Sequence, residues 1–140
     1  MDILSHTLSG FTIGATAMQF SNKGIKHKFL ILIASGIAAF FPDLDVITHW
    51  SGFDSTLGEW FNLNDSGVHI YHQKLWYSHH GLFHSLLMAV IFCLGCALLM
   101  LLFKARKSLM FELKNNTPFY LSVFFAYLVH LFEDMPTPEF

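Results

Sequence analysis

Two pairs of potential metal ligands stand four residues apart in this 140-residue chain. In the stretch Ser78-His79-His80-Gly81-Leu82-Phe83-His84-Ser85, the spacing of His80 and His84 places both imidazoles on one face of a helix. Ser78 is a suitable N-cap, so the pair would open that helix. His130 and Asp134 repeat the spacing later in the chain. An imidazole and a carboxylate one turn apart can bind one divalent ion, or the carboxylate can orient the imidazole from behind.

Two further acids directly follow a proline, in Phe41-Pro42-Asp43-Leu44-Asp45. Pro42 is expected to end a helix, and carboxylates two residues apart point to the same side of an extended backbone. At a boundary of low dielectric they would repel each other unless a cation lies between them. His6 adds an imidazole near the start of the chain. Taken singly, each of these groups could instead be a capping acid or a hydrogen-bonded histidine.

Together the motifs supply imidazoles and carboxylates from four separate places in the chain. Helical bundles build one-metal and two-metal sites from such side chains. With an open position, such a site acidifies bound water and provides a nucleophile for hydrolysis at neutral pH. A carboxylate, Asp45 or Glu133, would then take the proton of the water. The candidate ligands are His6, Asp43, Asp45, His79, His80, His84, His130 and Asp134.

The elements that must position these ligands are apolar helices. The chain is 54% hydrophobic and 13% charged, with a mean hydropathy of +0.48, which is typical of a membrane protein. The best transmembrane segment is Leu86–Phe103, and three shorter apolar runs accompany it at Leu8–Phe20, Phe29–Pro42 and Pro118–Phe132. We therefore expect an all-α, multi-pass transmembrane bundle of about four helices. Residues 1–140 would form a single integral-membrane domain.

The distribution of charge assigns sides to this bundle. Seven of the eight Lys and Arg residues lie in residues 23–28 and 104–114, two short stretches between apolar segments. Short loops rich in Lys and Arg stay cytoplasmic, so all the ligand motifs would lie on the non-cytoplasmic side of the plasma membrane, the inner membrane of a bacterium. The basic stretches are short and are explained by topology, which argues against nucleic-acid binding.

Residues 46–77 are expected to form a non-cytoplasmic loop at the membrane interface. This stretch holds all three tryptophans, Trp50, Trp60 and Trp76, together with Tyr71 and Tyr77. Such aromatic residues favour the headgroup layer. We therefore expect the loop to lie on the bilayer, to contact membrane lipids and to cover part of the helix ends.

Four ordered motifs also resemble a known family. These motifs are His6-Thr7 followed by glycines, Phe41-Pro42-Asp43-Leu44-Asp45, His79 five residues before His84-Ser85, and His130-Leu131 with Asp134 and Thr137-Pro138. The set resembles the YdjM-type family, whose members are regarded as membrane-bound, metal-dependent hydrolases. The resemblance covers most of the chain except the loop. Because the chain stops at Phe140, just after the last motif, a C-terminally truncated protein is a further expectation.

The resemblance adds an alternative for one ligand. The family motif His-Arg-x-x-x-His-Ser places its first histidine on His79 and its arginine on His80, whereas helical spacing pairs His80 with His84. Both histidines stay candidates. By analogy the resemblance extends to zinc-dependent phospholipase C and related helical nucleases, which favours zinc, with manganese or magnesium as alternatives.

The sequence thus predicts a membrane-bound, metal-dependent hydrolase. The site would lie at the lipid boundary, so a phosphoester or lipid-like substrate is expected. The first alternative is a membrane protein that binds a divalent metal for transport or sensing without hydrolysis. The second is a structural membrane protein whose His and Asp groups satisfy one another and bind no metal. The sequence does not indicate an oligomeric state.

Overall fold

The described part of the chain is mostly helical. The computed structural model describes residues 3–72, 82–104 and 108–134, and no strand occurs among them. This confirms the predicted all-α class. Each of the four predicted apolar segments lies in a helix: α1 (Ile3–Gln19), α2 (Ile25–Phe40), α4 (Leu86–Lys104) and α6 (Thr117–Asp134).

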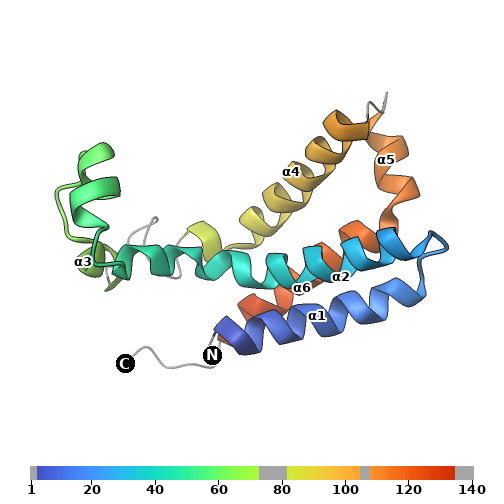
Figure 1. Cartoon of the computed structure of the whole chain (residues 1–140), viewed down its shortest axis with the longest axis horizontal. Coiled ribbons are helices and arrows are strands. Elements are labelled where there is room, and N and C mark those ends of the chain that lie inside the picture. Colours follow the sequence, from blue (N-terminus) through green and yellow to red (C-terminus); the bar gives the residue numbers. More distant parts are fainter. Residues whose placement is uncertain (1–2, 73–81, 105–107, 135–140) are drawn as a thin grey trace.

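Three of these helices form most of the core of the molecule. Figure 1 shows α1, α2 and α6 side by side, with α4 at an angle to them. α4 packs on α6, since Ala97 is fully buried in the core and the rings of Phe92 and Tyr127 are 5.8 Å apart. Gly10 allows α1 and α2 to approach closely, because a Cβ atom at Gly10 would lie 2.6 Å from the Cβ of Ala39. Small residues such as Ala39 and Ala126 are fully buried between the helices. The observed packing is therefore a three-helix unit with α4 attached at its side.

The second α-helix ends at Phe40, just before the proline, as predicted, but the chain stays helical beyond it. After α2 the chain continues as the 3-10 helix η1 (Phe41–His49), with Pro42 in its first turn. A proline is tolerated there because the first N–H groups of a helix have no intrahelical partner. The predicted extended backbone after Pro42 is therefore wrong. With three residues per turn, positions 43 and 45 lie about 120° apart around η1, so their spacing no longer places them on one side.

The third helix begins later than its motif suggested. Leu82–His84 form a separate 3-10 turn, η3, and α4 starts at Leu86. Ser85 is the N-cap, because its Oγ accepts a hydrogen bond from the backbone N–H of Met88 at 3.1 Å. The predicted N-cap, Ser78, lies outside the described residues. His84 thus precedes α4 instead of lying within it, which is a correction to the helical pairing predicted for this histidine.

The end of the bundle that lies away from η1 carries a short helix, α5 (Leu109–Asn115), which the sequence analysis did not anticipate. Its buried Glu112 accepts a hydrogen bond from Tyr120 Oη at 3.3 Å. Lys23, in the connection between α1 and α2, donates to the side chain of Asn116. The connection that carries Lys23 and the end of α5 therefore meet at one end of the molecule. The two basic stretches predicted to share a side of the membrane both reach this end.

The aromatic loop contains short helices beyond the other end of the bundle. A π-helical turn, η2 (Asp54–Gly58), is tied to α3 (Gly67–His72) by a 2.6 Å hydrogen bond from the Gly67 N–H to Asp54 Oδ1. α3 packs on η1 and lies away from the core in Figure 1. Trp50 and Trp60 are exposed. Their position in the headgroup layer stays a prediction.

Only one helix in the described ranges is long and apolar enough by itself to cross a membrane, Ile25–Leu44, which joins α2 to the start of η1. The apolar part of α4, Leu86–Leu102, is shorter. The number of membrane crossings therefore stays a prediction, whereas the helical nature of the four segments is confirmed.

Candidate metal centre

Ends of several helices converge on one cluster of imidazoles and carboxylates. Asp43 comes from the first turn of η1 and His84 from η3, while His130 and Asp134 come from the last turns of α6. The cluster is well shielded, since the side chains of His84, Asp43 and Asp134 are 4%, 11% and 8% exposed and His130 is fully buried. Four of the predicted ligands, distant in sequence, are therefore brought together.

The spacing within the cluster matches that of ligand atoms around one ion. His130 Nε2 lies 3.2 Å from His84 Nε2, 3.1 Å from Asp134 Oδ2 and 3.5 Å from Asp43 Oδ1. His84 Nε2 lies 3.4 Å from Asp134 Oδ2 and 3.8 Å from Asp43 Oδ1. Zinc bonds of about 2.0–2.1 Å at tetrahedral angles separate neighbouring ligand atoms by roughly 3.3–3.4 Å. The four residues each offer a ligand atom within 4.8 Å of the others.

The charge balance of this cluster also favours a cation. The two carboxylates, which are largely shielded from solvent, face the same pair of imidazole nitrogens. Buried carboxylates are stable only when they are neutralised and hydrogen-bonded. Either a protonated histidine or a divalent ion can supply the positive charge. Bringing two Nε2 atoms as close as 3.2 Å requires a proton or a cation between them, since an unprotonated imidazole nitrogen only accepts.

His6 lies beside this group and is supported by an acid. Its Nδ1–H donates to Glu133 Oε2 at 2.7 Å, and its Nε2 lies 3.1 Å from Asp134 Oδ1. Ser9 Oγ donates to the other Glu133 oxygen at 2.5 Å. A carboxylate behind an imidazole is the arrangement that orients histidine ligands in metal sites. Glu133 therefore positions His6, whose Nε2 points to the oxygen of Asp134 that is not directed to His84 and His130.

Tyr127 connects the segment that carries His84 to α6. The tyrosine is fully buried, and its hydroxyl donates to the backbone carbonyl of Phe83 at 2.6 Å. The ring of Phe41 packs against Phe83 and Phe92, with ring centroids 5.8 Å and 4.5 Å away. These contacts join the residues that precede Asp43 and His84 in the chain. These aromatic rings therefore pack together next to the chain segments that carry Asp43 and His84.

Sequence reasoning missed Tyr127 and Ser9. Tyr127 precedes His130 by three residues and Ser9 follows His6 by three, so each shares a helix face with a predicted ligand. That spacing was a usable signal.

The described part of the chain does not include every predicted ligand. His79 and His80 lie outside the described residues, as does the side chain of Asp45. The choice between His79 and His80 therefore stays open. Glu133, one of the two predicted proton acceptors, lies next to the four-residue cluster and contacts it through His6.

The fold and this site define a class of protein: a small all-helical protein that gathers buried His and Asp side chains, suited to a divalent cation, at one end of a helix bundle. The chain belongs to the YdjM inner membrane protein family, whose model matches residues 1–139. This confirms the family resemblance seen in the sequence motifs and supports a location in the inner membrane. Neither the curated proteins nor the solved structures include a match to the chain.

Proposed function

We propose that this protein is a multi-pass, divalent-metal-dependent hydrolase of the inner membrane that cleaves a phosphoester of a lipid-like substrate at the non-cytoplasmic face. The observation that carries the proposal is the cluster of Asp43, His84, His130 and Asp134, with contacts of 3.1–3.8 Å between ligand atoms from three separate segments. A merely structural set of polar groups does not need four ligands at the spacing of a single coordination sphere.

The ligand chemistry fits zinc best. Two imidazole nitrogens and two carboxylate oxygens form a mixed set, and zinc accepts both kinds of ligand. Its coordination number can rise from four to five, so four protein ligands would still admit a water molecule. Magnesium prefers six oxygen ligands, so it fits less well, while manganese accepts either kind. When bound, such an ion supplies acidified water and polarises a phosphoryl oxygen.

The residues of the chain then have distinct roles. The four clustered side chains hold the ion, and Glu133 fixes the orientation of His6 beside them. Because both Glu133 oxygens already accept hydrogen bonds, from His6 and Ser9, a positioning role suits Glu133 better than proton transfer. Asp45 is the remaining candidate for the proton acceptor. We assign it that role from its place in the Asp43-Leu44-Asp45 motif.

Helix lengths and charge support the proposed membrane arrangement. At 1.5 Å per residue, the 17, 19 and 18 residues of α1, α4 and α6 span about 25–29 Å, close to the 30 Å hydrocarbon core. α4 exposes apolar side chains such as Leu87, Leu98 and Leu102, as a lipid-facing helix does. The basic stretches reach the end of the molecule opposite the cluster, which favours a non-cytoplasmic site.

Burial of the cluster favours one alternative, a metal-binding membrane protein for transport or sensing. His6 is 1% exposed and His130 is fully buried. A catalytic centre must admit its substrate, whereas a sensing site can be closed. Hydrolytic activity therefore has to be tested separately from metal binding.

The test combines metal content with a substrate screen. The full chain is purified in detergent without chelators, and elemental mass spectrometry compares wild type with His84→Ala and Asp134→Asn. His69→Ala is the matched control, because His69 lies in α3 with a side chain that is 61% exposed. We expect about one or more equivalents of zinc or manganese in wild type and control, and little in the other two variants.

Hydrolysis of phospholipids and model phosphoesters by the loaded wild type, lost in His84→Ala, would support the hydrolase. Bound metal without hydrolysis of any phosphoester would favour transport or sensing. Folded wild type that stays metal-free after zinc and manganese are added would leave the structural alternative.

A further inference from the structure

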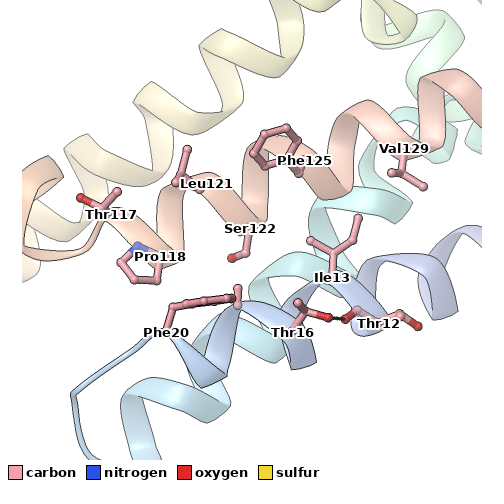
Figure 2. Close-up of a pocket in the computed structure, with 11 residues that line it drawn as sticks. Thr12, Ile13, Thr16, Phe20, Thr117, Pro118, Leu121, Ser122, Phe125 and Val129 are labelled. Carbon is pink, nitrogen blue, oxygen red and sulfur yellow. Dashed lines mark hydrogen bonds between the residues drawn. The ribbon is translucent and has the colours of Figure 1, made fainter.

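An apolar groove runs along the outside of the bundle between α1 and α6. It encloses about 660 Å³. Figure 2 shows side chains from both helices facing this space. Its walls include Thr16 and Ala17 of α1, Phe20 directly after α1, and Leu121, Ser122 and Phe125 of α6.

The hydroxyl groups in the groove do not make it polar. The four lining residues with hydroxyls are Thr12, Thr16, Thr117 and Ser122. Each hydroxyl donates to a backbone carbonyl three or four residues earlier in the chain, at 2.8–3.1 Å, and the dashed line in Figure 2 marks the bond from Thr16. Their hydrogens are therefore used within the helices, and the hydroxyls add little polarity to the walls. Such a surface suits a hydrocarbon chain better than a polar ligand.

One end of the groove leads to the candidate metal centre. Val129 is the last lining residue of α6, and Glu133 lies one turn further on the same face. On α1, Ser9 lies one turn beyond Ile13. The 2.5 Å hydrogen bond between Ser9 and Glu133 therefore joins the two helices at this end of the groove. Glu133 in turn contacts His6.

The dimensions match one lipid chain. From Thr117 to Val129 the groove follows twelve helical steps of 1.5 Å, about 18 Å. One leaflet of the hydrocarbon core is about 15 Å thick, half of the 30 Å core. The groove is therefore long enough to hold an acyl chain that spans one leaflet.

We propose that the groove between α1 and α6 binds one acyl chain of a membrane phospholipid and places the lipid headgroup beside Glu133 and the cluster of Asp43, His84, His130 and Asp134. The inference rests on the proposed function in naming the lipid as the substrate. The binding of the chain itself rests on the groove alone. In a membrane the surrounding solvent is lipid, so an apolar groove open to that solvent will be filled by it.

Photolabelling in vesicles tests this proposal. The full chain is reconstituted in phosphatidylethanolamine and phosphatidylglycerol with a trace of phosphatidylethanolamine carrying a diazirine in the middle of one acyl chain. After irradiation, the labelled residues are mapped by mass spectrometry. We expect labels to concentrate on Leu121 and Phe125. Thr16→Trp should fill the groove and lower this labelling at least fivefold, because Thr16 lines the groove and is exposed.

Ala15→Trp is the matched control, since Ala15 is exposed on the same turn of α1 but does not line the groove. It should leave the labelling of Leu121 and Phe125 unchanged. Ala17→Leu fills the same groove with a smaller side chain and repeats the test if Thr16→Trp reduces the yield of folded protein.

Labels spread equally over the groove and the exposed apolar residues of α4 would overturn the proposal. The same conclusion would follow if Thr16→Trp had no effect, if the label were displaced by a polyprenyl phosphate but not by phospholipid, or if irradiation joined two copies of the chain through the groove. Labelling and hydrolysis are measured separately, in wild type and in His84→Ala, to distinguish lipid binding in the groove from hydrolysis at the metal centre. If the label persists in His84→Ala while wild type shows no hydrolysis, the lipid groove is supported and the hydrolase is contradicted.

Discussion

Replacing Tyr127 with phenylalanine should weaken metal binding without touching a ligand. The hydroxyl of Tyr127 donates to the carbonyl of Phe83 at 2.6 Å, directly before His84 in the chain. In Tyr127→Phe the ring and its packing remain, but the 3-10 turn η3 loses its hydrogen bond to α6. The free protein would then sample positions in which His84 points away from the other ligands.

The size of the effect is limited by that one hydrogen bond. A neutral hydrogen bond contributes about 0.5–1.5 kcal/mol net, and a buried carbonyl left unpaired costs about 1–3 kcal/mol. Binding has to restore the position of His84, so the metal affinity can fall by no more than this free energy. With 1.4 kcal/mol corresponding to a factor of ten, we expect a loss of about tenfold.

The assay is competition between the protein and a zinc-chelating dye, with thermal unfolding of the metal-free protein measured in parallel. Tyr120→Phe is the control. Tyr120 lies on the same helix and is also buried, and its hydroxyl contacts Glu112 at the other end of the bundle. Both variants should lose about 1 kcal/mol of stability, but only Tyr127→Phe should bind zinc more weakly. Equal zinc affinity in Tyr127→Phe and wild type would refute the idea that Tyr127 positions His84.

Two further predictions concern the helix contact and the supporting acid. Gly10→Ala should lower stability by about 1–3 kcal/mol in detergent unfolding, because its Cβ would lie 2.6 Å from that of Ala39. Gly95→Ala is the control, since Gly95 also lies inside a helix but has open space around it and should lose no stability. Equal losses in the two variants would contradict close packing at Gly10. Glu133→Gln should weaken zinc binding by about tenfold, because a less firmly held His6 orients Asp134 less well, and the same dye competition measures the change. Loss of hydrolysis at unchanged zinc affinity would instead make Glu133 the proton acceptor.

The four long helices could be predicted from the sequence because each corresponds to a local run of apolar residues. A long uncharged run such as Leu86–Phe103 has few alternatives to a helix. Four ligands of the cluster were also recognisable, because His84, His130, Asp43 and Asp134 belong to short motifs with local spacing. Their meeting at one place was inferred from topology, and the structure brings these four together.

Other features depend on contacts that no local pattern contains. Pro42 normally suggests the end of a helix, yet here the chain continues as a 3-10 helix, and this choice sets the direction of Asp43. The start of α4 at Leu86 depended on which of two serines caps the helix. The role of Tyr127 required knowing that Phe83 lies beside α6. Glu133 could be recognised as an acid near the site, but its hydrogen bonds to His6 and Ser9 come from the packing of α1 on α6.

The order of the ligands along the chain has a consequence for how the protein is made. Asp43 and His84 precede α6, and the last turns of α6 contribute both His130 and Asp134. During synthesis from the N-terminus, a nascent chain that ends before α6 has only half of the cluster and no partner for His6. A cation could be held tightly only after α6 has inserted against α1 and α2. Loading would therefore be a late step of biogenesis, and a supply of metal at the membrane could act as a check on completed assembly.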